Sequence, residues 1–131
     1  MSPFNKHFLH YLTLFLLLQT ICADEKTTVI ITNDIGNGTL LTVHCKSKDD
    51  DLGTHVLAEF ASYSFSFRPN LFLTTLFFCS FAWQNEFKRF DIYVDKRDNR
   101  KCYPKCEWFI KPQGPCCKES NGQEECYPWN K

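Results

Sequence analysis

Three consecutive aspartates, Asp49–Asp51, are the residues of this sequence whose chemistry is most conspicuous. Clustered carboxylates can bind hard cations such as calcium, and beside a histidine they can act as acids or bases. A calcium loop of the EF-hand type places acidic ligands at alternate positions and a glutamate at the twelfth. Here the acids are consecutive, and Phe60 stands at the twelfth place counted from Asp49. We therefore predict no metal and no cofactor here, and the aspartates form either a polar turn or a recognition surface.

Two histidines flank the aspartates and raise the question of catalysis. His44 precedes Cys45, but neighbours along a strand point to opposite faces, so imidazole and thiol should not meet. His55 with Asp50 is a second imaginable pair, and it lacks a nucleophile. No serine or cysteine nucleophile motif and no glycine-rich phosphate loop occurs in the sequence. We therefore predict that the protein is not an enzyme.

Residues 1–23 have the pattern of a secretory signal peptide. Lys6 precedes an apolar run over residues 11–18, and the segment ends at the small residue Ala23. The run is shorter than the ~20 residues that cross a bilayer. We expect cleavage after Ala23, a secreted and extracellular chain, and no stable membrane insertion.

The charge balance limits the class of partner. The chain has 15 basic and 15 acidic residues, and loss of the predicted signal removes only one of them, Lys6. A nearly neutral chain lacks the basic excess of nucleic-acid binders. It also lacks the basic surface with which many defence proteins disrupt membranes. The length suits one domain.

Secretion also bears on the cysteines. Cys22 lies in the predicted signal, which leaves an odd number behind it, so one thiol is free or pairs between chains. In an oxidising compartment the others should form disulfides rather than a zinc site. They are Cys45, Cys79, Cys102, Cys106, Cys116, Cys117 and Cys126.

Strands must position these residues, because apolar and polar residues alternate and helical periodicity is hard to find. We expect strands at 27–32, 39–45, 54–60, 62–67, 74–83, 87–94, 106–110 and 116–118. Cys45, Cys79 and Cys106 share parity with apolar neighbours and should face inward, whereas Tyr93 should face away from Ile92. The predicted fold is all-β: a small disulfide-stabilised antiparallel β-sandwich of about seven to eight strands. It would span residues 24–118, with 119–131 as a loosely held polar tail.

Several fragments occur in one order: ITND, LTVHCKSKDDDLG, SYSFSF, TLFFCSFAW, FDIYVDKRD, and C-x-x-x-C-x-W-x-I with GPC behind it. This ordered set resembles the plant self-incompatibility S-protein family, with its S-protein homologues, from about Val29 to Cys116. The resemblance implies a small secreted plant β-sandwich held by disulfides. It also implies a ligand role, since the best-known members are recognised by a receptor on pollen. The family's usual cysteines fall at Cys45, Cys79, Cys106 and Cys116, often with Cys102.

Strand parity together with the family pattern leads us to predict two bridges, Cys45–Cys116 and Cys79–Cys106. A third would join Cys102 to Cys117 or to Cys126. In addition, Asn37-Gly38-Thr39 is a sequon for N-glycosylation in a predicted turn.

Two charged loops, at 46–53 and 95–101, are candidates for recognition, because sandwich domains carry recognition on the loops at their ends. The candidate residues are Asp49, Asp50, Asp51, Asp95, Lys96, Arg97, Asp98 and Arg100. The alternative is that both loops are only solvated connections. We predict a secreted ligand recognised through its loops by a cell-surface protein receptor. The competing interpretation is a secreted, non-catalytic defence or effector protein acting on microbes. The sequence leaves the oligomeric state of the protein open.

Overall fold

The computed structural model describes residues 7–14 and 26–130. Residues 7–14 are helical and exposed. No helix in these described ranges is both long and apolar enough to cross a membrane. The predicted signal peptide lies largely outside the described residues and its cleavage site lies entirely outside them, so both stay predictions.

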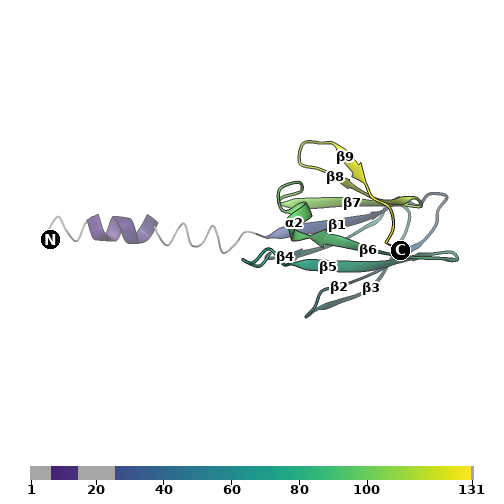
Figure 1. Cartoon of the computed structure of the whole chain (residues 1–131), viewed down its shortest axis with the longest axis horizontal. Helices are drawn as coiled ribbons and strands as arrows, with labels where there is room; N and C mark the ends of the chain where they lie inside the picture. The colour runs from purple at the N-terminus through teal and green to yellow at the C-terminus, as the bar shows by residue number, and fades with distance from the viewer. Residues whose placement is uncertain (1–6, 15–25, 131) are drawn as a thin grey trace.

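Residues 26–130 fold into two sheets that pack face to face, with one short helix at one end (Figure 1). The strands are β1 (Thr27–Asn33), β2 (Leu41–Lys46), β3 (Asp51–Leu57), β4 (Ser62–Phe67), β5 (Leu76–Trp83), β6 (Glu86–Val94), β7 (Lys105–Lys111), β8 (Gly114–Lys118) and β9 (Glu124–Cys126). The helix is α2 (Asp95–Asp98).

One sheet has five strands in the order β4-β1-β7-β8-β9, and the other has four in the order β3-β2-β5-β6. The predicted all-β, disulfide-stabilised fold is confirmed. The described residues hold nine strands rather than seven or eight, because the segment after Cys117 adds β9. The ladders are antiparallel except for β1 with β7, which run parallel. A parallel pair is possible here because the chain passes through the opposite sheet between these two strands.

The core lies between the sheets, where alternate residues of strands such as β1, β2, β5 and β7 point inward. The predicted inward direction of Cys45, Cys79 and Cys106 is confirmed, whereas the direction predicted for Tyr93 is not. The buried residues include Val29, Ile31, Leu41, Val43, Phe77, Phe81, Trp83, Phe90, Ile92, Trp108 and Ile110.

Tyr93 is the exception to the predicted alternation. It is 1% exposed, next to the fully buried Ile92. The register of β5 with β6 shifts between the pairs Phe77–Tyr93 and Cys79–Phe90, which marks a bulge. A bulge turns the side chain that follows it. The prediction that Tyr93 faces away from the core was therefore wrong.

The predicted disulfide connectivity is wrong as well. Cys45 is bonded to Cys79, its direct cross-strand partner in the β2–β5 ladder, with Cα atoms 4.0 Å apart. Cys116 is bonded to Cys126 across the β8–β9 ladder, with a Cα separation of 3.9 Å. Strand parity identifies the cysteines that face the core, but it does not identify their sheet. Two inward cysteines that are direct partners on neighbouring strands of one sheet lie closer to each other than to a cysteine of the opposite sheet.

The last bridge, Cys102–Cys106, joins the turn that precedes β7 to the second residue of that strand. Cys117 is left as a free, buried thiol, which agrees with the odd cysteine count. Burial raises the pKa of the Cys117 thiol to about 12, so it is protonated and unreactive at neutral pH.

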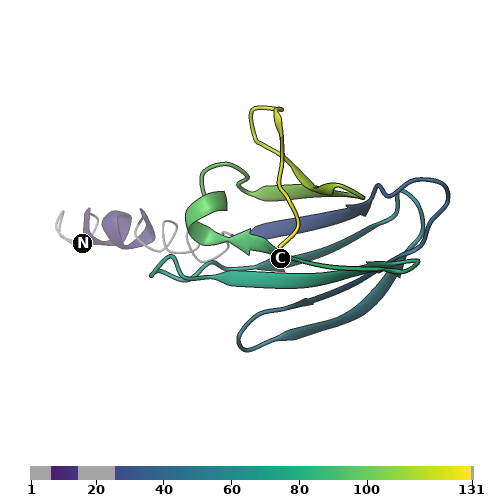
Figure 2. The same ribbon diagram turned by 45° about the vertical axis from the view of Figure 1, so that its right-hand side comes forward.

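Residues 119–130 are not a loose tail, so the predicted domain boundary after residue 118 does not hold. The disulfide to Cys126 fastens this segment, and Tyr127 then packs on Trp108 of the five-stranded sheet. Trp129 packs on Trp83 of the four-stranded sheet. The amide of Asn130 donates to the carbonyl of Arg89 at 3.1 Å. The C-terminal segment thus crosses from one sheet to the other, as the yellow trace in Figure 2 shows.

Candidate functional site

Three connections gather at the end of the sandwich where β1 begins: residues 47–50, residues 68–75, and residues 95–104 including α2. We call them the loop end. In Figure 1 they lie at the left side of the two sheets. The predicted charged loops, 46–53 and 95–101, therefore lie at the same end of the molecule.

The three aspartates have different roles. Asp51 opens β3, and its Oδ1 accepts hydrogen bonds from the amide of Gly53 at 2.9 Å and from His44 Nε2 at 2.6 Å. These two contacts, the amide first, hold the pKa of the Asp51 carboxyl below its usual value. Asp51 therefore closes the hairpin. Asp49 and Asp50 are exposed and remain available to a partner.

Two predicted recognition residues, Asp95 and Asp98, are buried instead, at 1% and 2% exposure. The Asp95 carboxylate accepts a hydrogen bond from Tyr93 Oη at 2.9 Å. Asp98 accepts one from the amide of Val94 at 2.9 Å, at the start of α2. Both aspartates were therefore wrongly assigned to a recognition surface, and they fix the turn from β6 into α2.

Arg97 is also structural. Its Nε and terminal nitrogen each donate to an oxygen of Asp98 at 2.8 Å. The same guanidinium lies over three rings, 5.0 Å from the centroid of Phe90 and 5.2 Å from those of Trp108 and Tyr127. It thereby ties α2 to both sheets and to the C-terminal segment. Of the predicted residues in 95–101, Lys96 and Arg100 are exposed.

The loop between β4 and β5 was not predicted as a site, and among the described residues it carries the two most exposed large apolar side chains. Leu71 is 95% exposed and Phe72 is 85% exposed. Asn70 organises the loop, since its Oδ1 accepts hydrogen bonds from the amides of Phe72 and Thr74, both at 3.1 Å. The loop is thus a defined turn that holds two large apolar side chains in water. The apolar triplet LFL just after Pro69-Asn70 was the available sequence signal.

This apolar turn is fixed to its neighbours. The amide of Asp95, at the start of α2, donates to the carbonyl of Thr75 at 3.2 Å. On its other side a hollow separates the turn from residues 47–50, and its lining includes Asp49, Asp50 and Arg68. Apolar, acidic and basic groups therefore lie side by side at the loop end.

Asn37 lies at the opposite end of the sandwich, between β1 and β2. It is exposed in a turn with a positive φ of 57°. The amide of the following Gly38 donates to Glu59 at 2.9 Å. Glycosylation at Asn37 stays a prediction, and a glycan there would leave the loop end uncovered.

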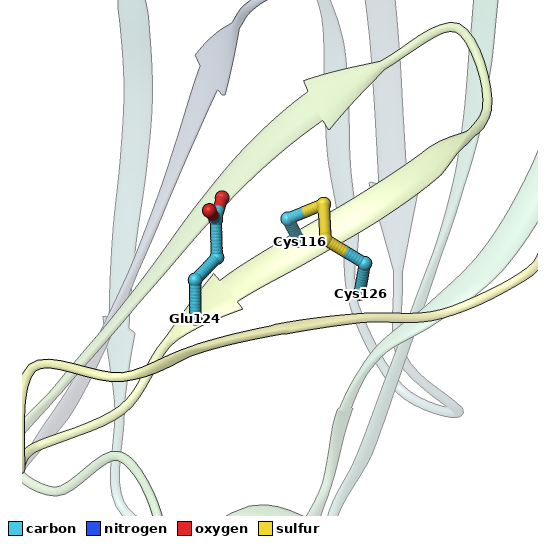
Figure 3. Close-up of side chains that lie close together, drawn as sticks. All are labelled: Cys116, Glu124 and Cys126. Atoms are coloured by element: carbon cyan, nitrogen blue, oxygen red, sulfur yellow. A yellow bond between two sulfur atoms is a disulfide. The ribbon is translucent and has the colours of Figure 1, made fainter.

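The other candidate side chains of the described residues are engaged in structural contacts. Among the described residues, one group has metal-ligand proximity: Cys116, Glu124 and Cys126. Figure 3 shows that the two sulfurs are bonded to each other beside the Glu124 carboxylate. A disulfide offers no thiolate, which is the form of cysteine that binds metals. His44 is paired with Asp51, and His55 stacks on Tyr63 with ring centroids 3.8 Å apart.

Two packed sheets, cross-strand disulfides and an elaborated loop end define a small disulfide-stabilised β-sandwich protein. Residues 28–129 match the model of the family described as plant self-incompatibility protein S1. The chain therefore belongs to the plant self-incompatibility S-protein homologue family, as the ordered sequence fragments predicted.

Curated relatives and a solved structure agree with this assignment. S-protein homolog 5 of Arabidopsis thaliana is 52% identical over 103 residues, which cover 79% of this chain and 77% of the relative. S-protein homolog 2 of the same plant is 51% identical over 113 residues, covering 82% and 70%. A solved structure is similar with a TM-score of 0.60 at 17% identity, covering 82% of this chain and 96% of that one. Its description is of self-incompatibility protein homologues, "a widespread family of small, highly stable, secreted proteins from plants".

Proposed function

We propose that this protein is an extracellular plant ligand, and that a cell-surface protein receptor recognises it through the loop end. The observation that carries the proposal is the apolar turn: Leu71 and Phe72 are almost fully exposed, yet Asn70 holds their backbone in place. Large apolar side chains gain nothing from such a position in the free protein. In a complex they would fill a pocket of the partner, as central apolar residues do in protein interfaces.

The charges around the turn favour a protein partner over a lipid surface. Asp49 and Asp50 line the same hollow as Arg68 and the base of the turn. Anionic headgroups would repel the two carboxylates, whereas a protein can place basic groups opposite them. A polar rim of both signs around an apolar centre is the usual anatomy of a specific protein interface.

Ligand action needs no catalysis, and we propose that the protein has none.

The proposal also accounts for the rigid scaffold behind the loop end. Disulfides and the Arg97–Asp98 pair fix the strands and α2, which in turn set the positions of the loops. A rigid scaffold with an ordered loop end lowers the entropy lost on binding.

The test is a binding experiment with labelled protein purified from cells that express the full chain. Wild-type protein should bind plant protoplasts saturably, and trypsin treatment of the protoplasts should abolish the binding. Asp49→Asn/Asp50→Asn should weaken binding and reduce its salt dependence, because rim charges act mainly on association. Saturable binding to microbial cells with none to protoplasts would instead support a defence or effector role. Binding to phosphatidylcholine–phosphatidylserine vesicles would contradict the choice of a protein partner.

A further inference from the structure

Each sheet ends in two edge strands, and three of the four edges are protected against pairing with another strand. β9 is only three residues long, and its Glu124 and Glu125 pair with lysines. β6 has charged side chains, and the amide of Asn130 bonds the carbonyl of Arg89 at its edge. β3 carries a bulge against β2, and Gly53 within it has a φ of +80°. Short length, charge and bulges are the devices by which natural sheets block edge-to-edge association.

The edge at β4 has none of these devices. Its sequence, SYSFSF, contains no charged residue and no proline. It pairs with β1 in an unbroken register from Thr32–Ser62 to Thr27–Phe67. Within the described residues no strand pairs with its other side. β4 is therefore a regular, uncharged edge strand.

The backbone groups that face this free edge can be identified. The amide of Asn33 donates to the carbonyl of Ala61, and its carbonyl accepts from the amide of Phe60, so the backbone of Asn33 faces the β4 side. The amide of Thr28 donates instead to the carbonyl of Pro104, on the β7 side.

Because backbone groups alternate along a strand, the odd-numbered residues of β1 bond to β4. Their register partners in β4 are Tyr63, Phe65 and Phe67. The amides and carbonyls of Ser62, Ser64 and Ser66 therefore point outward along the free edge.

We propose that β4 is the site of association with a second copy of this chain, through antiparallel pairing of the two β4 edges. Ser64 would lie opposite its own copy on the two-fold axis, with Ser62 opposite Ser66, and each pair would exchange two hydrogen bonds. This register also places the half-buried Tyr63 of one copy beside Phe65 of the other.

A second copy is the occupant that the strand itself specifies. The strand alternates serine and aromatic residues, so its antiparallel copy matches serine with serine and ring with ring. It carries no charge that a copy would repel. Such an isologous pairing closes as a dimer and does not propagate. The two loop ends would then point away from each other, so dimerisation leaves receptor binding unobstructed and is independent of it.

Sedimentation of the protein purified from cells expressing the full chain tests the proposal. A pair of short edges buries less than a standard interface, so we expect a weak dimer, half formed at roughly 10–100 µM. Ser64→Pro removes an outward amide without touching the β1 ladder, and should weaken the dimer at least about tenfold. Ser64→Ala keeps the backbone and should dimerise as wild type does. Wild-type protein that stays monomeric at ~1 mM, or a Ser64→Pro variant that dimerises normally, would overturn the proposal.

A charge pair provides a test that does not depend on the folding of the proline variant. Ser64 is exposed, so lysine or glutamate is tolerated there. Across the two-fold axis each residue would face its own copy, so S64K alone or S64E alone should dimerise roughly fivefold more weakly. An equimolar mixture of S64K and S64E should recover association through opposite charges. A mixture that associates no better than its components would overturn β4 as the interface.

Discussion

Replacing Arg97 by alanine tests how the loop end is held, and its effect can be worked out from the contacts. The change removes two charge-assisted hydrogen bonds to Asp98 and one to the carbonyl of Asp91. It leaves the Asp98 carboxylate, 3% exposed at its side chain, with the amide of Val94 as a donor. Breaking a buried ion pair on one side costs about 3–5 kcal/mol, since the remaining charge stays desolvated.

The expected loss lies at the lower end of that range. The Arg97 side chain is 20% exposed, so water can reach its vacated position and partly solvate Asp98. We therefore expect Arg97→Ala to lower the free energy of unfolding by about 3 kcal/mol. With a urea m-value of about 1–3 kcal/mol/M, the midpoint should fall by roughly 1–3 M.

Two further variants separate charge from geometry. Arg97→Lys keeps the charge but loses the planar fork and its stacking on the rings, so about 1–2 kcal/mol should be lost. Arg97→Ala/Asp98→Asn should be more stable than Arg97→Ala alone, because the unpaired buried charge is gone. A loss below ~1 kcal/mol for Arg97→Ala, or no recovery in the double variant, would refute this interpretation of the pair.

Three other predictions concern the bridges, the hairpin and the C-terminal segment. Cys45→Ala/Cys79→Ala opens a bridge between cysteines 34 residues apart, and in the loop-entropy model it should lower the free energy of unfolding by about 3.8 kcal/mol. Cys102→Ala/Cys106→Ala opens a bridge between cysteines 4 residues apart and should lower it by about 1.9 kcal/mol. Equal urea midpoints of the two variants would contradict the pairing. The pKa of the Asp51 carboxyl is lowered in the fold. Its contribution to the stability of the fold is therefore present above its unfolded pKa and is lost as the pH falls through its folded pKa. The urea midpoints of wild type and Asp51→Asn should therefore differ at pH 5 and converge below about pH 4, and a difference that grows on acidification would contradict the assignment. A Cβ at Gly114, where φ is +154°, would collide with the carbonyl oxygen of Tyr127. Gly114→Ala should therefore reduce the hydrogen-exchange protection of the Tyr127 and Asn130 amides. Unchanged protection would show that the C-terminal segment is not held at Gly114.

The strands and their faces could be predicted from the sequence, because side chains alternate along a strand and the core selects the apolar ones. The disulfide partners could not, since alternation gives Cys45 and Cys79 the same inward direction without placing them in one sheet. The bulge that buries Tyr93 likewise leaves no mark in the pattern of apolar residues.

The burial of charged residues at the loop end could not be predicted from the sequence for a different reason. The sequence pattern there is that of a solvated charge run, formed by Asp95, Arg97 and Asp98. Their burial depends on partners distant in sequence, such as Trp108 and Tyr127. The C-terminal segment is polar in composition, yet its two aromatic residues fasten it to both sheets. Composition averages over such single contacts, and the fold depends on them.

Recognition through the loop end is tested most directly by a matched pair of double variants. Leu71→Ser/Phe72→Ser removes the apolar turn, while Leu40→Ser/Phe87→Ser removes the same residue types, exposed at 58% and 59%, outside the loop end. Saturable binding of both labelled proteins to plant protoplasts should be compared with that of wild type. Recognition through the loop end predicts at least about a tenfold weaker affinity for the first variant and unchanged affinity for the second. Equal affinity of the two variants would contradict it.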